Sequence, residues 1–123
     1  MADNENLART QAAANTRELM RWATEAISMP LPEPVRRRAA TILSDDIGAM
    51  VAGSLEPQVA RARDGLTRTA SWTAEATVLA RGAPRLDRYS AASANGMAIT
   101  WCELDEGFRN ASCHGGAYTI PAL

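Results

Sequence analysis

The sequence contains no lysine, and all 13 of its basic residues are arginines. The chain therefore cannot by itself supply a Schiff-base lysine or a lysine general base. It has only two cysteines, too few for a disulfide scaffold. Aromatic residues make up only 5%, which is low for a surface that stacks on nucleic-acid bases. No apolar run approaches the roughly 20 residues of a membrane-spanning helix.

The chain also has no large excess of positive or negative charge, because its formal net charge is −1. Such a balance does not favour binding to nucleic acid or to an anionic membrane surface. Residues 1–7 are polar and acidic and lack the apolar stretch of a signal peptide, so we expect a cytoplasmic protein with free thiols. With 123 residues, of which 46% are hydrophobic, the chain has the size and composition of one globular domain.

Apolar spacing along the chain predicts a mainly α fold of about four helices with one short β element. Proline and glycine mark the breaks, as at residues 29–32, 53–57 and 82–84. The β formers of one short segment alternate imperfectly, and the glycine-rich end of the chain is expected to be a loop. The predicted helices are residues 4–28, 34–52, 57–69 and 87–104, the strand is 72–80, and the loop is 107–123.

The predicted fourth helix is unusual because residues 91–96 are nearly all small. A helix that is apolar on every side must be covered on every side. The apolar stripes of residues 11–27 and 35–51 would cover only about two of its sides. We therefore expect an exposed apolar patch on this helix, and such patches usually mark an interface.

A cluster of acids follows that helix and precedes the only histidine of the chain. Helical spacing would put Glu103 and Glu106 on one face, below Asn95. Crowded carboxylates raise one another's pKa, which suits proton transfer. Asp105 lies between these two acids, and His114 follows in a glycine-flanked loop where its imidazole can be reached. The alternative interpretation is a solvated helix end followed by a polar loop.

Two other groups of residues could suggest a site. Asp46 falls within the apolar stripe of its helix, so it is expected to be buried with an arginine partner, holding two helices together. The spacing of Cys102 and Cys113 fits no common zinc pattern, and both are better read as small apolar fillers. We expect no metal and no cofactor.

Three blocks of this sequence resemble the N-terminal part of the MmgE/PrpD family, which includes 2-methylcitrate dehydratase, cis-aconitate decarboxylase and iminodisuccinate epimerase. Each block alone is weak, but their order and spacing across about residues 20–123 make the resemblance fairly specific. The blocks are residues 32–36 with 45–48 and 52–53, residues 77–79 with 90–96, and residues 103–109 with 114–116 and 121–123.

The resemblance implies a largely helical domain and an enzyme that removes a proton next to a carboxylate of a small di- or tricarboxylate. Dehydration, decarboxylation or epimerisation would follow. By position in the family motif, Glu103, Asp105 and His114 would be catalytic. Asn95 and Glu106 would bind substrate, and no cofactor is implied.

The sequence departs from the family pattern at four positions. Glu103 replaces an aspartate, Gly107 stands where some members have threonine, Phe108 where many have histidine, and Gly115 where proline is usual.

Residues 1–123 correspond to the N-terminal part of the family's helical domain. The remainder of that domain and the lid domain, with a further catalytic lysine, are expected on a second polypeptide. The chain would then be a subunit or a processed fragment of a lyase or isomerase, silent alone, or would assemble as a homo-oligomer. The alternatives are a non-catalytic helical protein that binds or regulates a relative, and a relic without function.

Overall fold

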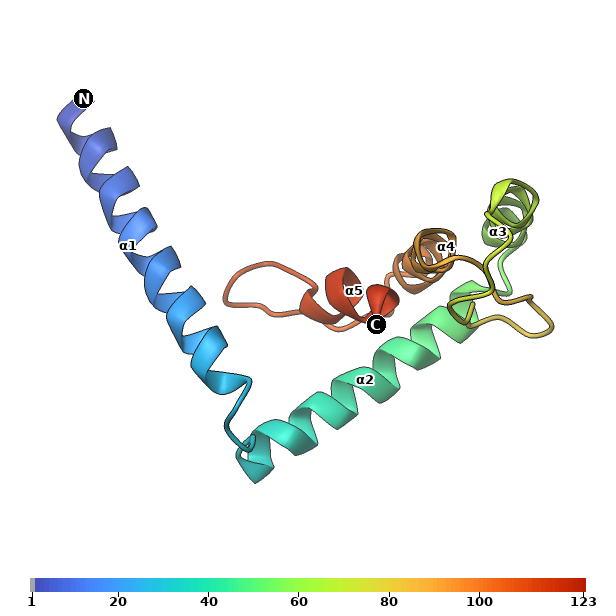
Figure 1. The fold of residues 1–123 in the computed structure, drawn as a ribbon, viewed down its shortest axis with the longest axis horizontal. Coiled ribbons are helices and arrows are strands. Elements are labelled where there is room, and N and C mark those ends of the chain that lie inside the picture. Colours follow the sequence, from blue (N-terminus) through green and yellow to red (C-terminus); the bar gives the residue numbers. More distant parts are fainter. Residues whose placement is uncertain (1) are drawn as a thin grey trace. The chain divides into compact units, whose positions relative to one another are not determined.

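The computed structural model describes residues 2–123, and the side chains from residue 4 onward. The chain divides into two compact units, one that ends at Arg36 and one that comprises Arg37–Leu123. Figure 1 shows the course of the chain through its helices. The elements are α1 (Ala2–Ala26), α2 (Glu33–Gly53), α3 (Pro57–Thr69), α4 (Arg88–Trp101), α5 (Gly115–Thr119) and a short 3-10 helix, η1 (Ile120–Ala122).

The prediction of a mainly α fold is confirmed, and all four predicted helices form. Pro57 occupies the first turn of α3, where a missing N–H costs nothing. The predicted strand at 72–80 is wrong as a strand. Its only pairing among the described residues is a single antiparallel bridge between Ala76 and Leu86, because the chain turns back for just one residue pair.

The prediction of a loop over residues 107–123 is also wrong in part, because this segment contains α5 and η1. Local propensity does not favour a helix that opens with Gly115 and Gly116. The first turn is instead fixed by a contact from outside it, since the Gly116 N–H donates to Glu106 Oε1 at 2.5 Å. Tertiary context overrides propensity here.

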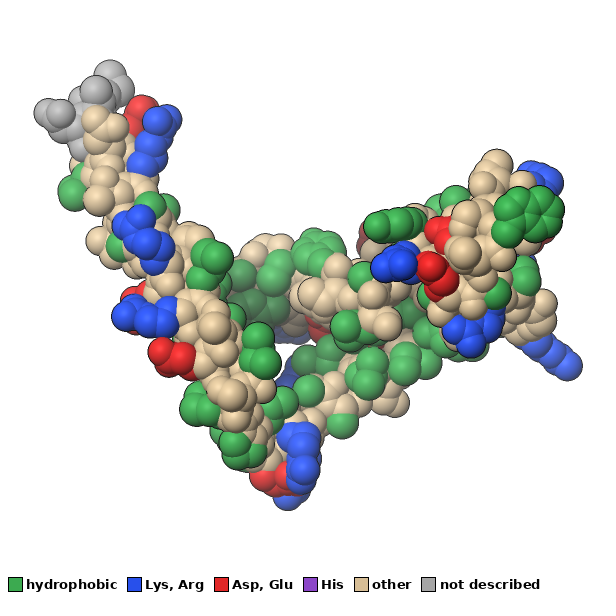
Figure 2. Space-filling model, in the orientation of Figure 1, with side chains coloured by type: hydrophobic (Ala, Val, Ile, Leu, Met, Phe, Trp, Pro, Cys, Tyr) green, Lys and Arg blue, Asp and Glu red, His purple; other side chains and the backbone are tan. Residues whose placement is uncertain are grey.

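The first unit consists mainly of α1, and its side chains are exposed. Among its described side chains only that of Ala26 is even partly buried. Large apolar side chains lie in the open along its second half and just after it: Leu19, Met20, Trp22, Ile27, Met29 and Leu31. Figure 2 shows hydrophobic side chains on the surface near the end of α1.

The second unit contains the core, which α4 organises. This helix packs against α3, α5 and η1, and it buries Ala91, Ala94, Asn95, Ala98 and Ile99. At the end of α2 the backbone passes so close that a Cβ on Gly53 would overlap the carbonyl oxygen of Ala98. The small residues of α4 thus allow close approach from several sides.

The expected apolar patch on α4 is wrong for the small-residue stretch 91–97, which this chain alone largely covers, although Tyr89 and Trp101 near the two ends of the helix are exposed. Within residues 91–97 only Ser93 is exposed. Exposed apolar side chains lie instead on α2, where Leu43, Ile47 and Val51 follow one another every four residues. Among the described residues, no helix is both long and apolar enough to cross a membrane.

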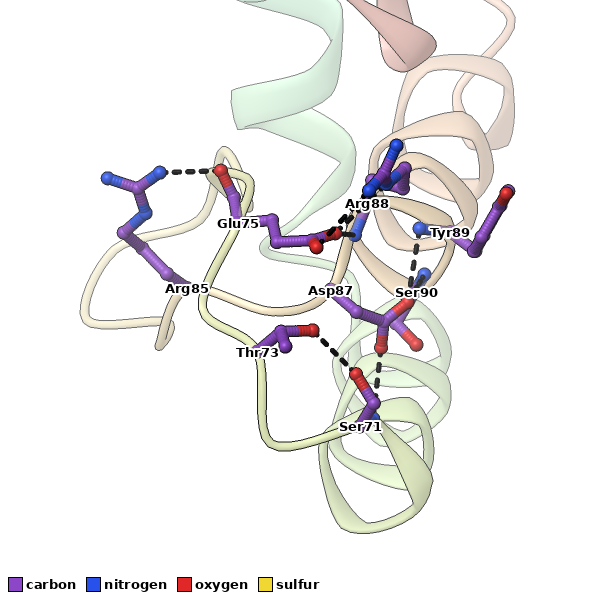
Figure 3. A network of polar contacts seen from close by, with 8 residues as sticks. All are labelled: Ser71, Thr73, Glu75, Arg85, Asp87, Arg88, Tyr89 and Ser90. Carbon is purple, nitrogen blue, oxygen red and sulfur yellow. Dashed lines mark hydrogen bonds and ion pairs between the residues drawn. The ribbon is translucent and has the colours of Figure 1, made fainter.

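A network of polar contacts fixes the N-terminus of α4 (Figure 3). Asp87 caps the helix by accepting from the N–H groups of Tyr89 and Ser90, and it also accepts from Ser71 N–H at 3.1 Å. The hydrogen bonds with Ser90, aided by those from Ser71 and Tyr89, lower the pKa of the Asp87 carboxyl. Beside the cap, Arg88 Nε lies 3.0 Å from Glu75 Oε2. These contacts join the 71–87 connection to the helix it precedes.

Candidate functional site

The segment between α4 and α5 carries the acids and the histidine singled out in the sequence. Helix α4 ends at Trp101, and Glu103 adopts a positive φ of 51°. This left-handed residue turns the chain out of the helix. A short closed loop follows, in which Phe108 N–H donates to the Cys113 carbonyl at 2.7 Å. The loop returns the chain to the start of α5.

Asp105 and His114 meet across this loop. The Nδ1 of His114 lies 2.9 Å from Asp105 Oδ2. The Asp105 side chain is only 4% exposed, whereas that of His114 is 48% exposed. A buried carboxylate at this distance fixes the ring orientation and favours the tautomer with its proton on Nδ1. The other ring nitrogen, Nε2, then carries the free electron pair that a general base needs.

The third acid of the cluster, Glu106, turns to the interior and meets Asp46 of α2. The Asp46 side chain is completely buried. Its Oδ1 accepts from the Glu106 N–H at 3.4 Å. The prediction that Asp46 is buried is confirmed, but the predicted arginine partner is wrong: its neighbour is a second carboxylate. The helix spacing showed that Asp46 points inward but not what would lie opposite.

This environment changes the pKa of Asp46. Burial raises it to about 6, and the charges of Glu106 and Asp45 act in the same direction. The hydrogen bond from the Glu106 backbone partly offsets the rise. Two carboxylates held together out of water cannot both ionise cheaply.

Gly116 completes this arrangement, although its place in the sequence predicted no role for it. Its N–H donates to Glu106 Oε1, and a Cβ at this position would overlap Asp46 Oδ2. Only glycine therefore lets α5 approach the two acids this closely. The available signal was the pair of glycines directly after His114.

Glu103 takes no part in the contact between Asp105 and His114. The expected alignment of Glu103 with Glu106 and Asn95 is wrong, because α4 ends at Trp101 and helical spacing no longer applies. Glu103 is exposed. Its side chain makes no hydrogen bond or ion pair with any residue that the structure describes. Its catalytic role stays a prediction.

Asn95 is buried on α4 and holds the preceding segment in place. Its Oδ1 accepts from Leu79 N–H at 2.9 Å, and its Nδ2 donates to the Thr77 carbonyl at 3.0 Å. Both ends of the amide are therefore engaged with backbone. The substrate-binding roles expected for Asn95 and Glu106 stay predictions.

Metal ligands are not gathered in the described part of the chain, where no group of three or more His, Cys, Asp or Glu residues could hold a metal ion. Cys102 and Cys113 are free thiols, and both are partly buried. The chemistry that this site can offer is proton transfer through a histidine oriented by a carboxylate.

Comparison with protein families gives a match. The model of the MmgE/PrpD N-terminal domain matches residues 17–123 and therefore includes α2 through η1 with the whole of the 102–116 segment. No curated protein and no solved structure matches the chain. Since the match to the model of the family's N-terminal domain covers most of the sequence, the chain belongs to the MmgE/PrpD family.

Proposed function

We propose that this chain is one part of a lyase or isomerase that acts on small di- or tricarboxylates. Its His114 would take a proton from the carbon next to a substrate carboxylate. The observation that carries this proposal is the 2.9 Å pairing of His114 Nδ1 with the buried Asp105. Membership in the MmgE/PrpD family supports the class of reaction.

The geometry supports a simple division of labour. Asp105 holds the ring by Nδ1 and stabilises the imidazolium that forms when Nε2 accepts a proton. The half-exposed ring can be reached by a substrate, while the buried carboxylate cannot. Dehydration and epimerisation can begin from the carbanion that this step produces. In decarboxylation the departure of CO2 itself leaves an electron pair on carbon, and a protonated imidazole at the same place can donate the proton that this carbon then takes.

The proposal includes a second chain. The carbanion needs electrostatic stabilisation, and neither Asp105 nor Glu106 is placed to provide it, because Asp105 pairs with His114 and Glu106 is turned to Gly116. A partner polypeptide with the remainder of the helical domain and the lid domain, or a second copy of this chain, would supply cationic groups. Exposed apolar side chains on α2, such as Leu43, Ile47 and Val51, offer it a contact surface.

The deciding experiment measures proton transfer at the carbon next to a substrate carboxylate. The chain is coexpressed with a polypeptide carrying the C-terminal part of the family, and deuterium uptake next to a carboxylate is followed by NMR for cis-aconitate, 2-methylcitrate and related acids. We expect His114→Ala to slow this exchange by roughly 10²-fold or more. Tyr118→Phe, which changes an exposed side chain of α5, is the matched control.

A second candidate function is a non-catalytic protein that binds or regulates a full-length relative. One observation favours it: of the expected catalytic residues, Glu103 is not brought to the pair formed by Asp105 and His114. Unchanged exchange in the His114→Ala complex, with native mass spectrometry showing both chains present, would support this second function and contradict the first.

A further inference from the structure

Two buried carboxylate oxygens of the chain have no hydrogen-bond partner. They are Oδ2 of Asp46 and Oε2 of Glu106. The other oxygen of each side chain is occupied, since Asp46 Oδ1 accepts from Glu106 N–H and Glu106 Oε1 accepts from Gly116 N–H. Both unpartnered oxygens face the same point, because a Cβ built on Gly116 would overlap Asp46 Oδ2 and lie 3.0 Å from Glu106 Oε2.

Leaving two such oxygens ionised and unpaired in the interior is costly. A metal ion would need further ligands, and the described residues offer no third His, Cys, Asp or Glu beside these two. An arginine would also serve, but none bonds to either oxygen. One proton resolves the problem, because a protonated carboxyl group donates its O–H to the other carboxylate and satisfies both oxygens.

We propose that Asp46 and Glu106 share one proton, and that this shared proton closes a latch that positions Asp105 and His114. The latch comprises Asp46, Glu106 and Gly116. Asp46 is thus a positioning residue that acts through the loop and not on the substrate.

The connectivity explains how the latch would act. Glu106 directly follows Asp105, and Gly116 lies two residues after His114. The Glu106 side chain therefore ties together the two ends of the loop, next to which Asp105 and His114 lie. Asp46 ties the same loop to α2. The consequence for catalysis rests on the proposed function, whereas the latch itself rests on geometry alone.

The direction of its pH dependence follows from the surroundings of Asp46. The charged groups that act on it are Glu106 from the loop and Asp45 from its own helix, and both oppose its ionisation. The part of α5 that Asp46 contacts is the backbone of Gly116. Asp105, which pairs with His114, directly precedes Glu106 in the sequence. The folded-state pKa of Asp46, about 6, is above the ordinary value of 3.8. The stabilisation is therefore complete below the ordinary value and is lost as the pH rises through about 6.

The test measures hydrogen exchange at the two backbone N–H groups that donate to the carboxylates of the latch. Amide exchange of Glu106 and Gly116 is measured by NMR on the full chain from pH 5 to 7.5, and rates are corrected for the intrinsic pH dependence of exchange. We expect protection of both amides to fall by about tenfold or more over this range. Glu106→Gln should make protection independent of pH, because the side-chain amide of the glutamine donates to the ionised Asp46 carboxylate and so replaces the shared proton. Asp46→Asn should do the same.

Two controls separate this latch from its neighbours. Asp45→Asn removes a nearby exposed charge, and His114→Gln removes the imidazole that pairs with Asp105. Both should keep the pH-dependent loss of protection. The proposal is overturned by constant protection in the unaltered chain, by a transition that survives Glu106→Gln, or by one that disappears in His114→Gln. The proposal is also overturned if circular dichroism shows that Glu106→Gln and Asp46→Asn are both unfolded at pH 5. None of these results depends on catalytic activity, so they leave the proposed function separately testable.

Discussion

Asp105 and Glu106 are neighbours in the sequence with the same kind of charged group, yet they take opposite roles. The Asp105 carboxylate reaches a half-exposed imidazole, and the Glu106 carboxylate reaches the backbone of α5 and the buried Asp46. Adjacent side chains outside a helix can diverge in this way. At the scale of single residues, the site is therefore two carboxylate contacts placed back to back, one that orients a base and one that anchors the loop.

Asp105→Asn should disturb the ring of His114 without unfolding the chain. The amide cannot hold the Nδ1 proton as a carboxylate does, so the neutral imidazole should lose its preference for the Nδ1–H tautomer. Long-range nitrogen–proton NMR correlations report the tautomer directly. In the assembled enzyme we expect exchange next to the substrate carboxylate to fall by about 10²-fold or more. An unchanged tautomer population in the variant would contradict the proposed orienting role.

Gly116→Ala should be strongly destabilising, because its methyl group would occupy the position of Asp46 Oδ2. The loop and α5 would have to move away from α2, and the cost should be on the order of 1–3 kcal/mol, as for other overpacked sites. Chemical denaturation provides the measurement. Gly48→Ala is the matched control, since a Cβ there meets nothing within 4 Å. Ala is the better helix former, so this control should be neutral or slightly stabilising.

At the scale of elements, α4 is the helix on which the second unit is built. It begins at a cap made by Asp87, packs by small residues, and ends where Glu103 takes a positive φ. One polar side chain in its middle, Asn95, ties the extended segment at 77–79 to it. The helix therefore positions both the connection before it and the candidate site after it.

Asn95→Ala should destabilise the fold by roughly 1–3 kcal/mol, because Leu79 N–H and the Thr77 carbonyl would lose their partner. Thermal unfolding followed by circular dichroism measures this. Ser93→Ala changes an exposed residue of the same helix and should have little effect. If Asn95→Ala leaves stability unchanged but weakens carboxylate binding in the assembled enzyme, its role is in binding substrate and not in holding the 77–79 segment.

At the scale of the whole molecule, the apolar surface is distributed unevenly. The small-residue stretch of α4 is largely covered within its unit, whereas large apolar side chains on α1 and α2 are open to solvent. On α2, Leu43 is 42% exposed, Ile47 37% and Val51 48%. Residues four apart lie on one helix face, so these three form a stripe. An apolar stripe of this kind usually contacts another protein surface.

The purified chain alone should therefore self-associate and show no turnover of 2-methylcitrate, cis-aconitate or related acids. Sedimentation velocity over a range of concentrations measures the association. Leu43→Gln combined with Ile47→Gln should shift the distribution toward monomer while circular dichroism stays unchanged. A monodisperse and active monomer would contradict the proposed need for a second chain.

Sequence alone determined much of this protein. The spacing of apolar residues placed α2 and put Asp46 on its buried side, and the proline and glycine breaks with the run of small residues placed α3 and α4 to within a few residues. The order and spacing of motifs from residue 32 to the end were enough to identify the family. These features are local or linear, because they depend on periodicity within one helix or on residue order, and both can be read without knowing what packs where.

Only the tertiary structure decided how the candidate site is assembled. The contact between Asp46 and Glu106 joins residues 60 positions apart, so no local spacing encodes it. Helix α5 forms against propensity because its Gly116 meets Glu106, and Glu103 leaves its expected face because α4 ends two residues before it. Helical spacing predicts neighbours only while the helix continues. Beyond Trp101, the burial of Asp46 and the close approach allowed by Gly116 determine which acids point inward and which one meets His114.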